Sequence, residues 1–199
     1  MKTAAIAIAL TAIFCACSTP SSVQPLSIPL TYKTQAQPAE ITAVQPCATV
    51  SSIDVEDARA EKAIGKRFVE GKSGATADVT TTASITDWVR SGAAAMYQRG
   101  NVSMAASGRP SLHLRIDQIA TNENVLHRAG YDGRVVISAE LRGSGGNVCW
   151  KDRVEGASEN YGYAGSVDNY NETLNHALDR AMNRIFSSPD YRSAACGCN

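Results

Sequence analysis

Hydrophobic and polar residues alternate along two stretches in the second half of the chain. Residues 112–117 place Leu, Leu and Ile between His, Arg and Asp, and residues 135–141 repeat the pattern with Val, Ile, Ala and Leu. A period of two puts alternate side chains on opposite faces of a strand, so each stretch predicts a half-buried strand. Residues 148–154 follow a glycine-rich turn at 143–147 and are expected to pair back as a hairpin.

Two other stretches carry hydrophobic residues at helical spacing. One helix is predicted over 84–99, where Ser84 is placed to cap the start and Gly100 to end it. Its apolar stripe consists of Ile85, Trp88, Val89, Ala93 and Met96. A second helix is predicted over 169–186, and its stripe consists of Leu174, Leu178, Ala181 and Ile185. One-sided stripes of this kind indicate helices that pack against a core.

Shorter strands are expected over 50–55, 66–69 and 102–105, with a loop over 72–77 between the second strand and the first helix. The order is then strand, helix, several strands and helix. We predict an α+β fold, with a mixed, mainly antiparallel sheet and two helices packed on one face. Residues 48–188 are assigned to this single domain, and 189–199 to a cysteine-containing tail.

The N-terminus resembles the signal peptide of a bacterial lipoprotein. Lys2 precedes an uncharged apolar run over 3–14, which is shorter than the roughly 20 residues needed to cross a bilayer. Small Ala16 precedes Cys17, so we predict cleavage after residue 16 and acylation of Cys17 by chains such as palmitate. Phe14 departs from the aliphatic residue that the pattern prefers. Ordinary secretion with cleavage nearby is the alternative.

Residues 17–47 are rich in Pro, Ser, Gln and Ala. We predict an extended tether here, with room for a short strand around 26–32. Ser18 follows the acylated cysteine in place of the Asp that retains many Gram-negative lipoproteins in the inner membrane. The predicted location is therefore the periplasmic face of the outer membrane, and the predicted partner is the membrane itself, through the lipid anchor.

Four cysteines remain after Cys17, and an even number in an oxidising compartment favours disulfides. They are Cys47, Cys149, Cys196 and Cys198. Three pairings are open, although Cys196 and Cys198 are expected to reach distant partners because one residue separates them. A metal site is the rival hypothesis; since no histidine lies near these cysteines in sequence, no metal ligand is assigned.

The remaining chemistry is sparse. Lys and Arg number 19, as do Asp and Glu, so no basic excess indicates nucleic-acid binding. The sequence contains no hydrolase elbow, zinc motif or phosphate-binding glycine loop, and no catalytic residue or cofactor is predicted. Asp54, Asp57 and Arg59 are interpreted as a structural cluster in which an Asp–Arg pair fixes a turn. The candidates for an exposed interface are Tyr161, Tyr163 and Tyr170.

The pattern also resembles the YajG family of bacterial lipoproteins. The resemblance rests on Asp57-Ala58-Arg59 leading to Ile64-Gly65, on the segment 112–116, and on a final helix through 175–185. The same order of elements is similar to the auxiliary lipoproteins of ABC-type lipid exporters. Both resemblances imply a role in the envelope and supply no catalytic residue.

The leading hypothesis is therefore a non-enzymatic outer-membrane lipoprotein that acts as a binding or assembly module in the periplasm, with an envelope protein as partner. The first alternative is an auxiliary subunit of an envelope lipid or glycan transporter, which predicts an exposed apolar groove or a stable membrane-protein partner. The second is a periplasmic hydrolase, which requires His, Asp or Ser side chains converging in a pocket.

Overall fold

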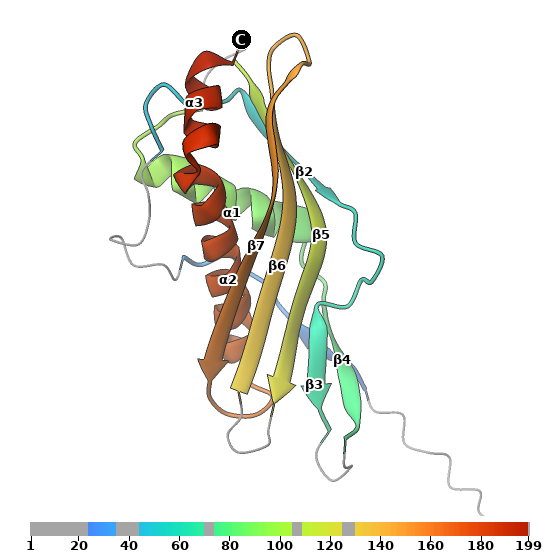
Figure 1. The fold of residues 1–199 in the computed structure, drawn as a ribbon. Coiled ribbons are helices and arrows are strands. Elements are labelled where there is room, and N and C mark those ends of the chain that lie inside the picture. Colours follow the sequence, from blue (N-terminus) through green and yellow to red (C-terminus); the bar gives the residue numbers. More distant parts are fainter. Residues whose placement is uncertain (1–23, 35–43, 70–73, 105–108, 125–129, 199) are drawn as a thin grey trace, which may run out of the picture.

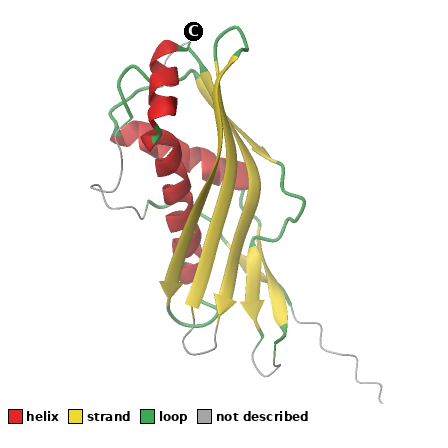
Figure 2. Ribbon diagram, viewed as in Figure 1, coloured by secondary structure: helices red, strands yellow, loops and turns green. Residues whose placement is uncertain are grey.

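A computed structural model describes residues 24–34, 44–69, 74–104, 109–124 and 130–198. These residues form one seven-stranded mixed sheet with three helices on one of its faces (Figure 1, Figure 2). The predicted signal peptide and Cys17 lie outside the described residues. The mixed α/β fold with a mixed sheet is confirmed. The prediction of a mainly antiparallel sheet with two helices is matched only roughly, because three strand pairings are parallel and there are three helices.

Three long antiparallel strands form the centre of the sheet. They are β5 (Ser111–Asn124), β6 (Gly130–Arg142) and β7 (Val148–Tyr161). The alternation predicted their existence, but each strand extends beyond its predicted limits. A bulge between Ile116 and Gln118 shifts the register of β5. The bulge keeps the buried positions on one face after the simple alternation in the sequence ends.

Four short strands complete the sheet beyond β5. β2 (Ser52–Asp57) runs parallel to the first half of β5, and β3 (Gly65–Phe68) continues along its second half. β4 (Thr76–Thr81) pairs with β3, and β1 (Leu26–Ile28) forms the outer edge beside β4. The predicted loop over 72–77 was wrong at its end, because β4 begins at Thr76. The strand predicted at 102–105 is absent from 102–104, where Val102 N–H donates to Tyr97 O and closes the preceding helix.

The helices cover one face of the sheet. α1 (Ile85–Arg99) and α2 (Val167–Ser187) begin at Ser84 and Ser166, whose hydroxyls accept backbone N–H groups of the first turn. Gly100 ends α1 as predicted, but it does so with a negative φ. A Cβ there would lie 2.8 Å from Val44 O, so close approach of the chain is the reason for glycine.

The extended tether was wrong over 24–34, because this part of the chain is folded, while the short strand allowed around 26–32 is confirmed as β1 over Leu26–Ile28. Ile28 and Leu30 are buried in the core. Farther along, Tyr32 Oη donates to Asp179 Oδ1 at 2.7 Å, and Asn175 Nδ2 donates to Thr31 O at 3.0 Å. Side-chain hydrogen bonds thus fix this segment across α2. Because such bonds to distant residues impose no hydrophobic period on the segment, the sequence pattern did not predict that it is folded.

The predicted C-terminal tail was also wrong in its conformation. Residues 189–197 form α3 (Pro189–Gly197), which Ser188 caps and Pro189 begins. Tyr191 donates to or accepts from the buried Tyr97 hydroxyl at 2.7 Å, and its ring packs edge-on against Trp150 at 5.1 Å. Burial raises the pKa of Tyr191 to about 12, so this phenol stays protonated.

Candidate functional site

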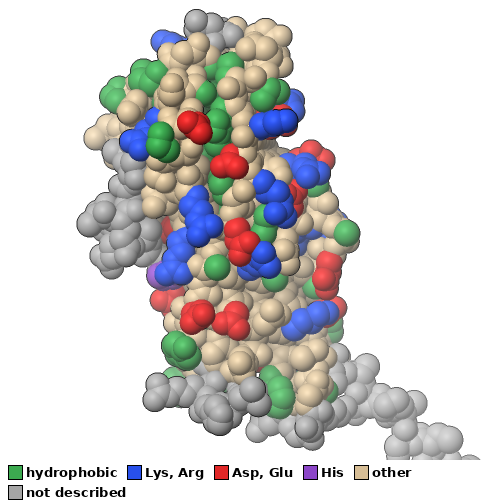
Figure 3. Space-filling view, viewed as in Figure 1, with side chains coloured by type: hydrophobic (Ala, Val, Ile, Leu, Met, Phe, Trp, Pro, Cys, Tyr) green, Lys and Arg blue, Asp and Glu red, His purple; other side chains and the backbone are tan. Residues whose placement is uncertain are grey.

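Among the described residues, no helix or strand covers the face of the sheet opposite the helices, and this face is lined with charged side chains (Figure 3). We call it the outer face. Strand alternation directs the charged positions of β2, β5, β6 and β7 to this side. The register places Asp54, His113, Glu140 and Lys151 in one row across four strands, and Glu56, Arg115, Ser138 and Arg153 in the next.

Charges of opposite sign pair across this face. Asp117 Oδ1 accepts from Arg115 at 2.9 Å, and its Oδ2 accepts from Arg153 at 3.0 Å. Arg134 pairs with Glu155 at 2.6 Å. Exposed pairs of this kind contribute about 0–1 kcal/mol each, so the array stabilises the fold only weakly. Its main effect is to hold charges of both signs at fixed positions.

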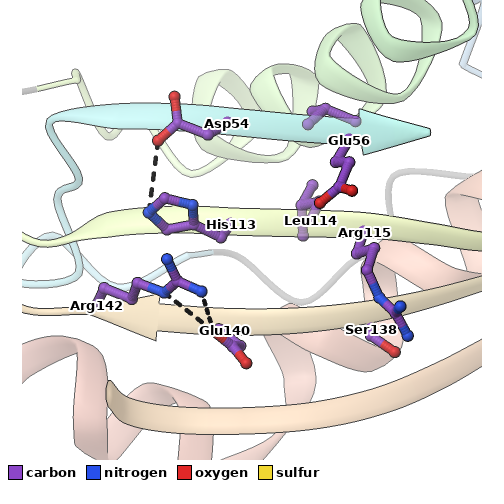
Figure 4. Close-up of a pocket in the computed structure, with 9 residues that line it drawn as sticks. Asp54, Glu56, His113, Leu114, Arg115, Ser138, Glu140 and Arg142 are labelled. Atoms are coloured by element: carbon purple, nitrogen blue, oxygen red, sulfur yellow. Dashed lines mark hydrogen bonds and ion pairs between the residues drawn. The ribbon is translucent and has the colours of Figure 1, made fainter. Parts of the chain in front are cut away.

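A shallow hollow of about 250 Å³ lies on the outer face over β2, β5 and β6 (Figure 4). Asp54, His113, Glu140 and Arg142 line it. Arg142 donates two hydrogen bonds to Glu140 Oε2, at 3.0 and 2.6 Å, and these bonds lower the pKa of the Glu140 carboxyl. The hollow therefore offers fixed donors and acceptors, and its walls are charged.

Beside this hollow, Ser111 lies close to two of its lining residues, His113 and Asp54. Ser111 Oγ lies 2.9 Å from His113 Nε2, and Asp54 Oδ2 lies 3.6 Å from that same nitrogen. A Ser-His-Asp relay needs the serine on one ring nitrogen and the carboxylate on the other. This trio therefore lacks relay geometry. Sequence analysis placed His113 on the polar face of its strand, and the structure confirms that position.

A second feature is the end of the sheet at which β3, β5 and β7 terminate. Here Glu123 accepts four hydrogen bonds: from Tyr131 Oη at 3.3 Å, Tyr170 Oη at 3.3 Å, Phe68 N at 3.0 Å and Gly165 N at 2.5 Å. Burial, with the nearby Glu123 charge, raises the pKa of Tyr170. Glu123 thus fixes the loop between β7 and α2 to the sheet.

The three tyrosines proposed as an interface separate into two groups. The side chains of Tyr161 and Tyr163 are exposed, at 65% and 90%, whereas Tyr170 is fully buried. Tyr170 is therefore corrected from an interface candidate to a core residue, because it lies on the inward stripe of α2 and packs edge-on against Tyr131. We call the end of the sheet that carries Tyr161 and Tyr163 the tyrosine end.

The four cysteines form two disulfides, Cys47–Cys196 and Cys149–Cys198, with Cα–Cα distances of 5.0 and 5.9 Å. Both join α3 to distant parts of the fold. Of the three pairings left open by the sequence, this is the one that the structure supports. Within the described residues, no group of three or more His, Cys, Asp or Glu side chains could hold a metal ion.

The Asp57–Arg59 cluster has the structural role predicted for it. Arg59 is buried and donates from Nε to Asp57 Oδ1 at 2.8 Å and from Nη2 to Oδ2 at 3.0 Å. A further bond from Nη1 reaches Ala63 O. Asp54 does not belong to this cluster, because its side chain lies on the outer face with His113.

We expect Asp57→Asn to lower the free energy of unfolding by about 2 kcal/mol at pH 7. Hydrogen bonds from Arg59 lower the pKa of Asp57 from its ordinary 3.8 to about 2. A lowered pKa stabilises the fold above pH 4, and this contribution is lost as the pH falls through 2. Urea unfolding at several pH values measures it. The exposed Asp132, changed to Asn, is the control. A deficit in Asp57→Asn that persisted unchanged at pH 2 would contradict the assignment.

Several solved structures are similar to this chain, although no protein-family model and no curated protein matches the sequence. A Xanthomonas campestris protein of family DUF330 has a TM-score of 0.51 at 11% identity, over 85% of this chain and 96% of that one. A minor lipoprotein from Acinetobacter baumannii gives 0.37 at 10%, over 75% and 95%. A PelC dodecamer from Paraburkholderia phytofirmans gives 0.36 at 15%, over 70% and 92%.

The Xanthomonas campestris comparison supports the mixed α/β fold alone. None of these three proteins is identified as a member of the YajG family, so that resemblance stays a prediction. In the described part of the chain, none of the helices combines the length and the apolarity that a membrane crossing requires.

Sequence reasoning missed the residues that organise the tyrosine end. Glu123 lies where the alternation of β5 has already been shifted by the bulge, and no motif surrounds it. Its role depends on Phe68 and Gly165, which are 55 and 42 residues away. Glu123 lies in the polar stretch Thr121-Asn122-Glu123-Asn124 at the end of β5, where nothing in the local sequence distinguishes it.

Proposed function

We propose that this chain is a lipoprotein of the cell envelope that acts as a non-catalytic binding or assembly module in the periplasm. Acyl chains on Cys17 would hold it on the periplasmic face of the outer membrane. The signal-like residues 1–16 and the small Ala16 before the cysteine support the anchor. Ser18 supports outer-membrane sorting.

The uncovered outer face is the observation that carries the binding role. One face of the sheet packs against helices, while the other presents long rows of fixed charges to solvent. Because both signs are interspersed, this face suits a protein partner with complementary charges better than a polyanion, which would favour a single-sign field. The Ser111, His113 and Asp54 geometry supports a non-catalytic role for the hollow.

The test is photo-crosslinking in cells from single positions of the acylated protein. A photoreactive residue at Lys151 or Arg153, both exposed on the outer face, is expected to give a discrete adduct with an envelope protein. The same residue at Arg184, exposed on α2, is the matched control and is expected to give none. Charge reversal by Lys151→Glu is expected to reduce the adduct at position 153 severalfold, because charged surfaces set the encounter.

Equal adducts from the outer face and from position 184, or none from either, would refute the binding role of the outer face. Acyl labelling tests the lipid anchor independently of the binding role of the outer face. The Cys17→Ser substitution is expected to abolish labelling, and labelling that persists would refute the anchor. Mass spectrometry of the adduct identifies the partner. A transporter subunit there would favour the hypothesis of an auxiliary transport protein.

A further inference from the structure

The chain enters the described fold at the same end of the sheet as the exposed tyrosines. Arg67 Nη2 donates to Gln24 O at 3.0 Å, which places Gln24 beside the last residues of β3. Phe68, the next residue, donates to Glu123 at 3.0 Å, and Glu123 pairs with Tyr131 in β6. These contacts follow one row of residues from the β1 edge of the sheet to β6.

The row continues into β7, where Tyr131 pairs with Asn160 and Tyr161 follows. Gln24 and Tyr161 therefore lie at one end of the sheet, near its two opposite edges. Five interstrand steps separate β1 from β7, or about 24 Å at the usual strand spacing. Figure 1 shows β3, β5 and β7 ending together at the lower end of the sheet.

Covalent geometry fixes how far this end can be from the lipid. Gln24 lies seven residue steps after Cys17, and a fully extended segment of that length spans at most about 25 Å. A folded domain of 100 residues has a radius of gyration of about 13 Å, so such a domain would not fit between Gln24 and a membrane that holds an acylated Cys17. The bilayer would therefore be the nearest large surface to the β1 edge of this end.

Tyr163 lies in a loop whose backbone is held in place by hydrogen bonds. Its carbonyl accepts from Tyr131 Oη at 2.5 Å, from Ser166 N at 3.2 Å and from Asn169 Nδ2 at 3.3 Å. Its side chain nevertheless projects into solvent at 90% exposure. An exposed ring on a fixed backbone loses little conformational freedom on contact, which favours a contact surface.

We propose that Tyr161 and Tyr163 rest in the headgroup layer of the same membrane that holds the acyl chains of Cys17. This inference rests on the proposed lipidation of Cys17. Tyrosine suits the headgroup layer because its ring is apolar and its hydroxyl can stay hydrated. With the anchor at one edge of the sheet and the tyrosines at the other, two separated contacts set the strands upright on the membrane. The outer face then stands free for a partner in the periplasm.

The test uses full-length acylated protein in vesicles of phosphatidylethanolamine and phosphatidylglycerol, with and without brominated acyl chains, which quench tryptophan at short range. Tyr163→Trp places the probe at the tyrosine end. The matched control is Val148→Trp, since Val148 is 49% exposed at the start of β7, about 43 Å away along the strand. The native Trp88 and Trp150 are buried and supply a constant background.

The fluorescence that Trp at 163 adds to that of the native tryptophans is expected to fall about twofold with brominated lipid, as for an interfacial aromatic. The fluorescence added by Trp at 148 is expected to stay unchanged. Quenching at both positions, or at neither, in protein of acylated mass would overturn the inference while leaving the anchor intact. A blue shift at 163 that grows with protein concentration in detergent would assign the surface to a second copy and also overturn it. Intact mass without acyl chains would refute the anchor, and the inference with it.

Discussion

Replacing Cys47 and Cys196 with serine is expected to lower the free energy of unfolding by about 5 kcal/mol. This disulfide joins residues 149 positions apart, so it removes a large share of the chain entropy of the unfolded state. It also fixes α3, whose buried anchors are few: Tyr191, Ala195 and Cys198. Loss of the bond should therefore loosen α3 as well as destabilise the whole domain.

Urea unfolding followed by tryptophan fluorescence measures this effect, since Trp150 packs against Tyr191 of α3. The Cys149→Ser, Cys198→Ser pair should cost about 4 kcal/mol, because its loop of 49 residues is shorter. Ser193→Ala, on the exposed side of α3, is the control and should be near neutral. An unchanged midpoint, or a peptide map joining Cys47 to another cysteine, would contradict the assigned pairing.

Gly156→Val is expected to lower the free energy of unfolding by about 3 kcal/mol or more. Gly156 lies in β7 directly beneath α2, and an added Cβ would sit 1.8 Å from Ala177 O and 2.5 Å from Ala181 N. These are backbone atoms, so the clash cannot be relieved by a side-chain rotation. The helix must move away from the sheet, and its buried stripe then loses contact.

Gly145→Ala is the matched control for this substitution. Gly145 lies in the β6–β7 turn, where a Cβ would meet nothing closer than Asn147 Oδ1 at 3.6 Å. Its urea midpoint should stay close to that of the unaltered protein. If Gly156→Val unfolded at the same urea concentration as this control, the close packing of α2 on β7 would be refuted.

The local pattern of hydrophobic residues was sufficient to predict the strands and helices that pack one face against the core. The alternation in β5 and β6 and the stripes of α1 and α2 predicted these elements, because burial of one face imposes a period of two or 3.6 on the residues themselves. The same logic predicted Trp88 as core, and it lies buried with Nε1 donating to Asn175 Oδ1 at 2.9 Å.

The residues of the candidate sites were harder to predict from the sequence. Tyr161, Tyr163 and Tyr170 occupy one polar aromatic stretch, yet the last is core and the first two are exposed. The distinction depends on where the loop ends and α2 begins. The hydroxyl of Ser166 decides this by accepting from Asn169 N.

The sequence by itself determined the signal-like start with Cys17, the paired strands of the centre, the two main helices and the even set of cysteines. The tertiary structure alone decided the cysteine pairing, the folding of residues 24–34 and the gathering of Glu123 with the tyrosine loop. Those features depend on contacts between distant residues, such as Cys47 with Cys196, which are 149 positions apart, and Tyr32 with Asp179, which are 147 apart. A local period records which face a residue turns to the core, but it does not record which distant residue meets it there.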